Sequence, residues 1–123
     1  MKLSQFSTEQ ALDVLCEIAP YVTAIVADEE LMANLGKAVK AEENMTRAGV
    51  LMLGAERLSK IVPIVLKKRR AEVLGIVAAV NQMSVEEIEH QNALKTAGQI
   101  RDICKDKELL DFFRSCVEQE QSE

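Results

Sequence analysis

Apolar side chains recur along this chain at the three- and four-residue spacing of amphipathic α-helices. The first stripe follows the sequence STEQ, in which the Ser7 hydroxyl can accept from the Gln10 amide while the Gln10 side chain reaches back to the cap. A helix is therefore predicted to begin after Ser7 and to kink or restart at Pro20, which lacks an amide proton. Residues 21–26 are β-branched enough for a strand, but their helical neighbours favour continued helix.

The middle of the chain predicts two further helices. Asp28 is suited to cap a helix whose first turn carries two glutamates, favourably placed at the positive end of the helix dipole. Residues 41–45 carry charge without periodicity and are the expected internal loop. Thr46 then opens the longest predicted helix, which Pro63 should bend in its last third.

Shorter helices complete the prediction. One covers residues 73–80, and a second capping box at Ser84 opens the next. A polar break then precedes a helix whose apolar face is Leu94, Ala97, Ile100 and Cys104. Asp106 caps the final helix, which is expected to end near Val117.

Composition agrees with an all-α fold. The chain has 123 residues, of which 48% are hydrophobic and only 3% aromatic, so its core must be aliphatic. Five Gly and two Pro supply too few turns for a many-stranded β-fold. We expect a compact single-domain bundle of six to seven short to medium helices over residues 1–117, followed by a disordered acidic tail at 118–123.

The charge and the cysteine content limit the classes of partner and the cellular compartment that we expect. The net charge of −5 argues against a general nucleic-acid binder, although residues 41–80 carry +3 between acidic flanks. Three widely spaced cysteines suggest reduced, mostly buried thiols in a cytosolic protein. The longest uncharged run, 73–85, is too short to span a bilayer, and the N-terminus lacks an apolar signal core, so we expect no membrane contact.

Catalytic chemistry is thinly represented. His90 is the single histidine, and its i, i+4 partner Glu86 has no further ligand in support, so an exposed histidine on an acidic helix is the preferred interpretation. Cys104 and Cys116 lack a neighbouring base that could activate a thiolate. We therefore predict no enzymatic activity, no cofactor and no metal.

One segment has the outline of a helix-turn-helix. Residues 75–91 contain a helix, a turn and a second helix capped by Ser84. That second helix carries three glutamates and no basic or aromatic residue with which to contact a base edge. A small DNA-binding regulator that uses this segment stays an alternative, although its second helix is acidic. The basic run 67–70 is interpreted first as a solvated helix end.

The chain has more apolar positions than short amphipathic helices need. The run 61–66 is continuously apolar except for Pro63, and Phe112 and Phe113 are adjacent although neighbours on a helix cannot share one face. Two explanations stay open. A central helix can be buried on all sides, or an exposed apolar groove can receive the amphipathic helix of another chain.

Several segments together resemble one family. They are residues 5–16, the run IVPIVLKKRR at 61–70 with AEVLGIVAAVN after it, SVEEIEHQN at 84–92 and DKELLDFFRSC at 106–116. In their order along the chain and in their pattern of residues, they resemble the small tail assembly chaperones of long-tailed, siphovirus-type bacteriophages.

The resemblance implies an all-α, non-enzymatic protein of the infected bacterium's cytoplasm that is absent from the mature virion. Such chaperones bind the tape-measure protein, a long helical chain with exposed apolar surface, and keep it soluble until tail-tube subunits assemble around it. The implied partners are the tape-measure protein and, as further candidates, the tail-tube protein and a second copy of this chain. A structural subunit of the virion is the alternative function in the same setting.

No binding motif carries over residue by residue, so the surplus apolar positions supply the candidate surface. They lie in the 50–66 helix and the closing helix, with the basic run as a charged rim. The candidate residues are Leu53, Ile64, Leu66, Leu109, Phe112 and Phe113, bordered by Lys67, Lys68, Arg69 and Arg70.

Overall fold

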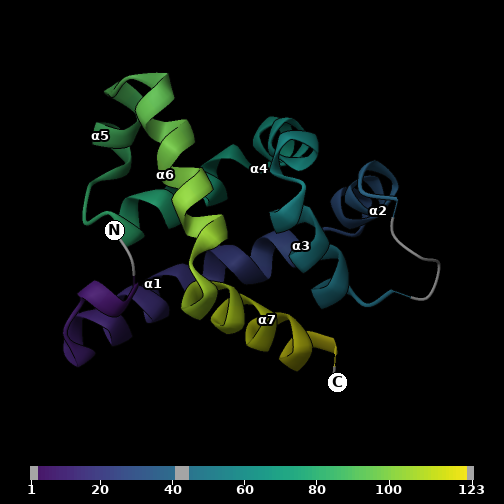
Figure 1. Cartoon of the computed structure of the whole chain (residues 1–123), viewed down its shortest axis with the longest axis horizontal. Helices are drawn as coiled ribbons and strands as arrows, with labels where there is room; N and C mark the ends of the chain where they lie inside the picture. Colours follow the sequence, from purple (N-terminus) through teal and green to yellow (C-terminus); the bar gives the residue numbers. More distant parts are fainter. Residues whose placement is uncertain (1–2, 41–44, 122–123) are drawn as a thin grey trace.

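The computed structural model describes residues 3–40 and 45–121, and these are almost entirely α-helical (Figure 1). This confirms the predicted all-α bundle of six to seven helices. After a short 3-10 turn at Leu3–Gln5, the helices are α1 (Thr8–Val26), α2 (Glu29–Ala38), α3 (Arg47–Glu56), α4 (Leu58–Val80), α5 (Val85–His90), α6 (Ala93–Lys105) and α7 (Lys107–Gln121).

Helix α1 crosses the bundle and packs most extensively against α4 and α7 (Figure 1). Its predicted capping box is present, with the Gln10 amide donating to Ser7 Oγ at 3.2 Å. The predicted interruption at Pro20 is wrong, because the helix continues to Val26. Proline removes the hydrogen bond to the carbonyl of Cys16, and both residues lie on the exposed side, where water can replace it.

The core is aliphatic, as predicted. Every α-helix contributes at least one buried apolar side chain, and the last six residues of α4, Gly75 to Val80, are all buried. The largest fully buried side chains are Ile18, Leu31, Leu35, Ile88 and Leu109. Burial on this scale is the main favourable term in folding.

The predicted long helix after Thr46 is in fact two. Thr46 does cap α3, accepting from the Gly49 amide at 3.0 Å, but the chain leaves helical geometry at Arg57 (φ −114°, ψ 52°) and restarts as α4. The Arg57 guanidinium donates to the carbonyl of Val39 at the end of α2. At Gly54, an added Cβ would lie only 3.1 Å from Ile61 Cδ1, so the glycine permits α3 and α4 to fold closely together.

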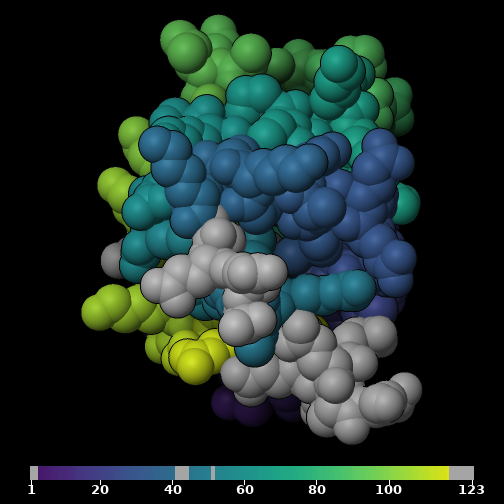
Figure 2. Space-filling model, turned by 90° about the vertical axis from the view of Figure 1, so that its right-hand side faces the viewer, coloured from purple at the N-terminus to yellow at the C-terminus, as the bar shows by residue number. Residues whose placement is uncertain are grey.

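The bend in α4 is also displaced from its predicted position. The helix passes through Pro63 and breaks at Arg69 (φ −125°, ψ 42°). In the space-filling view, α2 (blue) lies along the part of α4 (teal) that precedes this kink (Figure 2).

Helix α7 continues to Gln121, four residues past the predicted end near Val117. The predicted tail therefore begins as helix, and residues 122–123 lie outside those described. So do 41–44, most of the expected internal loop. Within the described ranges, no single helix is long and apolar enough to cross a bilayer; α1 and α2 qualify only together, and they meet at a bend of 79°.

A candidate protein-binding groove

An open groove of about 1600 Å³ lies between α4 on one side and α5 and α6 on the other, with Tyr21 of α1 also lining it. The apolar side chains along it include Leu58, Val62, Leu66, Leu74, Val85, Ile88, Leu94, Ala97 and Ile100. Leu94 is the most exposed large apolar residue of those described, with 82% of its surface accessible. The groove is thus an apolar surface with no partner inside the described chain.

Helix α6 forms one wall of the groove, because most of its apolar side chains are not buried in the core. Ile103 is its one buried residue among those described. The predicted apolar face, Leu94, Ala97, Ile100 and Cys104, lines the groove. Leu94 and Ala97 are exposed, whereas Ile100 and Cys104 are partly buried. A local clamp holds this wall: the Gln91 side-chain amide donates to Thr96 Oγ1 at 2.8 Å and to Gln99 Oε1 at 2.6 Å, bracing the corner between α5 and α6.

The opposite wall depends on the kink at Arg69, which Asp28 holds in place. Asp28 Oδ1 accepts from the Leu31 amide at 3.0 Å as the predicted cap of α2, and from Lys68 Nζ at 2.9 Å. Asp28 Oδ2 accepts from Arg69 Nε at 2.9 Å and lies 2.8 Å from Arg69 Nη2. These bonds tie the N-terminus of α2 to the middle of α4.

The environment of Asp28 strongly favours its charged form. Its side chain is only 5% exposed. The Leu31 amide, followed by the Lys68 ammonium and the Arg69 guanidinium, holds the pKa of the carboxyl well below its usual range. The same contacts raise the pKa of Lys68 and of Arg69, so all three groups stay ionised together.

Charged side chains border the groove. Arg70 lies on the α4 side and Arg101 and Lys105 on the α6 side, while Glu56 and Glu89 are the acidic lining residues. Arg57 also lines the groove, but its guanidinium is bonded to the backbone of α2. The exposed border is therefore mixed, with basic groups in excess.

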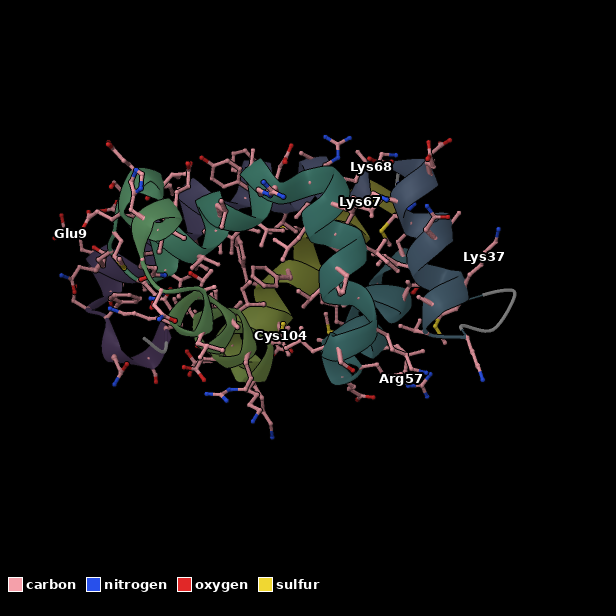
Figure 3. All side chains as sticks on the ribbon, turned by 90° about the horizontal axis from the view of Figure 1, so that it is seen from above. Glu9, Lys37, Arg57, Lys67, Lys68 and Cys104 are labelled. Atoms are coloured by element: carbon pink, nitrogen blue, oxygen red, sulfur yellow. The ribbon has the colours of Figure 1, made fainter. Side chains whose placement is uncertain are left out.

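The three thiols differ in setting. Cys104 lines the groove and is half-buried, and burial raises its pKa, as it does that of Cys116. Cys16 is exposed on α1 and the other two are only partly buried, so the prediction of mostly buried cysteines is wrong. Figure 3 shows Cys104 across the opening from α4, away from the Lys67 and Lys68 side of that helix. A raised pKa does not favour a nucleophilic thiolate.

The predicted binding residues separate into distinct places. Leu66 and Arg70 line the groove, whereas Ile64, Lys67 and Lys68 line a smaller cleft of about 760 Å³ between α4 and α2. Lys68 and Arg69 pair with Asp28, and α4 continues through them to Val80, so the interpretation of residues 67–70 as a solvated helix end is wrong.

Two predicted surface residues belong to the core. Leu109 is 0% exposed and Phe113 8%, because this face of α7 packs against α1 and α3. Their assignment to an exposed binding surface is wrong. Leu53 and Phe112 are half-buried against the core, and the two phenylalanine rings meet edge to face with centroids 6.5 Å apart.

Sequence reasoning missed Leu94, Val62 and Tyr21 as groove residues. The α6 stripe was visible in the sequence, and a stripe of that kind signals an apolar face without saying whether the fold covers it. The sequence did contain one signal. Apart from that stripe, α6 consists mostly of small or polar residues, so it has few other apolar side chains to bury.

Other kinds of site gain no support. Among residues 3–40 and 45–121, no cluster of three or more His, Cys, Asp or Glu side chains could hold a metal ion. The turn within 75–91 leads into α5, a six-residue helix whose Glu86, Glu87 and Glu89 are exposed. Comparison with protein families, curated proteins and solved structures finds no match for this chain.

Proposed function

We propose that this chain is a tail assembly chaperone whose groove binds an amphipathic helix of the tape-measure protein. It keeps that protein soluble in the cytoplasm of the infected bacterium and releases it as tail-tube subunits assemble, so that it is absent from the mature virion. The observation that carries the proposal is the uncovered apolar groove with Leu94 standing 82% exposed at its edge. The segment resemblance supports the choice of client.

The size and lining of the groove favour a polypeptide over a small molecule. Small-molecule pockets typically enclose roughly 300–1,000 Å³ and converge a few polar groups on the ligand. This groove measures about 1600 Å³, is open, and is lined mainly by aliphatic side chains from facing helices. Such a surface suits the apolar stripe of another helix, which would supply the missing partner for α6.

Reversible binding suits the shallow apolar wall. A client helix would bury the half-exposed side chains of α4 and α6 without a large ordered interface, so each contact is individually weak. Many copies bound along one long client would together cover its apolar stripe. Tail-tube subunits can then displace the copies one at a time.

The alternatives have less support. Exposed carboxylates on α5 would oppose the phosphates of DNA, which disfavours a regulator that uses residues 75–91. A structural virion subunit makes a different prediction, namely that the chain is found in purified particles.

Co-expression with the large protein encoded directly downstream tests the function. We expect the soluble fraction of the client to rise when the wild-type chain is present and the two to co-purify. L94Q should lose this effect. L12Q should retain it, because Leu12 is the other large exposed apolar residue of those described but does not line the groove. A client whose solubility is indifferent to the wild-type chain would overturn the chaperone proposal.

Thiol protection locates the binding surface. A C16S/C116S variant leaves Cys104 as the single thiol in the groove, and C104S/C116S leaves exposed Cys16 as the control. Bound client should slow maleimide labelling of Cys104 and leave labelling of Cys16 unchanged. Equal labelling of Cys104 with and without bound client would place the interface elsewhere.

A further inference from the structure

The α6 wall of the groove is basic although its surroundings are acidic. Residues 93–105 carry three basic side chains and one acidic one, within a C-terminal third, 81–123, whose net charge is −5. Two of the three, Arg101 and Lys105, line the groove. Arg57 and Arg70 also line it, against Glu56 and Glu89 as the acidic lining residues, so basic residues are in excess at the groove although the whole chain is acidic.

The two cations are spaced along the wall by one helical turn. Residues at i and i+4 lie about 5–6 Å apart, and like charges at that spacing oppose helix formation. Among the described carboxylates, none pairs with Lys105, and Arg101 has only an exposed contact with its neighbour Asp102 at 3.7 Å, which contributes little. The pair is thus open to an external anion.

The position of Arg101 directs its charge along the wall. Its Nη2 lies over Gly98, where an added Cβ would be 3.8 Å away, and Gly98 itself lines the groove. Across the groove, Arg70 is exposed on α4 and has no ion pair among the described residues. Cations therefore border both sides of the apolar surface.

We propose that the groove selects amphipathic helices whose apolar stripe is bordered by acidic residues, with two carboxylates one turn apart opposite Arg101 and Lys105. This rests on the proposed function, since it specifies which helix the groove accepts. The overall charge of −5 and the local charge predict opposite preferences. Long-range electrostatics favours a basic peptide, whereas the border of the groove favours an acidic one. Arg70 contributes to the same selection from the α4 side.

Two designed peptides of about 20 residues, long enough to form helix, test this. They share one leucine and alanine stripe, and one carries glutamate and the other lysine at the bordering positions. Binding is measured by fluorescence anisotropy at low salt. We expect the glutamate peptide to bind roughly three- to tenfold more tightly, as a few exposed ion pairs provide, and the preference to shrink with added salt.

Charge-matched variants assign the preference to the groove. R101Q/K105Q should remove most of it, because Arg70 alone then remains, whereas K95Q/K107Q, which removes the same charge from exposed positions outside the groove lining, should preserve it. Loss in both variants would reduce the effect to net charge and overturn the proposal.

The remaining outcomes separate this selection from the function beneath it. Equal binding of both peptides, or preference for the lysine peptide, would overturn acidic selection and leave the apolar groove as a helix-binding site. Binding of neither peptide would overturn the proposed function itself. If sedimentation then showed a dimer at assay concentration, a second copy of this chain would be the occupant.

Discussion

The ring of Tyr21 lies directly over Gly75, so closely that a Cβ added at the glycine would be 2.5 Å from Tyr21 Cζ. No real Cβ contact is that short, so α1 can approach α4 here only because residue 75 has no side chain. Tyr21 also lines the groove. The contact thus links the packing of the two longest helices to the shape of the candidate site.

We expect G75A to lower the free energy of unfolding by about 1–3 kcal/mol, because the added methyl overpacks a buried contact. Y21A should relieve the clash, so the double variant should be less destabilised than the sum of the single ones. Urea unfolding of the four proteins in the cycle measures this. Additive effects would show that Tyr21 is not what limits residue 75.

Local signals explain which parts of the fold were predictable. The caps at Ser7, Asp28, Thr46, Ser84 and Asp106 all lie where the sequence places them. Capping depends on a side chain and backbone amides two or three residues away, so the pattern is complete within a few residues.

Contacts between distant residues explain what the sequence did not predict. The break at Arg57 is accompanied by a bond to Val39, 18 residues away, and the kink at Arg69 by one to Asp28, 41 residues away. Neither position carries a glycine or proline to mark it. Pro63 is a residue that usually indicates a kink, yet it lies within continuous helix.

The candidate site was only partly predictable for the same reason. A surplus of apolar residues indicated that some must be exposed or buried on several sides, but it did not say which. Adjacent Phe112 and Phe113 illustrate this: packing against the rest of the fold buries the second more deeply. The groove is a property of which helices lack a neighbour, and that is settled only by the tertiary arrangement.

D28N should make stability less dependent on pH. The folded-state pKa of Asp28 lies below its unfolded value, so its ion pairs stabilise the fold above the ordinary aspartate range, and this contribution is lost as the pH falls through and below that range. Asparagine keeps the ability to cap α2 but not the charge. We expect a lower Tm than wild type at neutral pH and a smaller difference in acid.

Thermal unfolding monitored by circular dichroism between about pH 2 and pH 7 measures this dependence of Tm on pH. D13N, at an exposed position on α1, is the control for removing one carboxylate. If the Tm of D28N stayed a constant interval below that of wild type at every pH, the charge of Asp28 would not be the stabilising feature.

R69K and R70K test the kink with neighbouring, charge-conserving changes. Arg69 uses Nε and Nη2 on Asp28 and Nη1 on Glu72, an arrangement that a single ammonium cannot reproduce. Exposed Arg70 has no comparable set of contacts. R69K should therefore lower Tm and weaken binding of the helical client, while R70K should leave Tm unchanged. Equal melting temperatures would mean that the kink does not need the guanidinium.

Ile88 and Leu94 separate stability from binding along one groove. Both line it, but Ile88 is buried beneath the surface while Leu94 projects from it. I88A should lower the free energy of unfolding by about 2–5 kcal/mol, the usual cost of emptying a buried aliphatic site. L94A should change it by less than about 0.5 kcal/mol and still weaken binding of an amphipathic helix roughly tenfold, because the lost contact forms only in the complex. Chemical unfolding and peptide titration of the same two variants measure both quantities, and a strongly destabilised L94A would show that Leu94 packs within the fold and is not available to a partner.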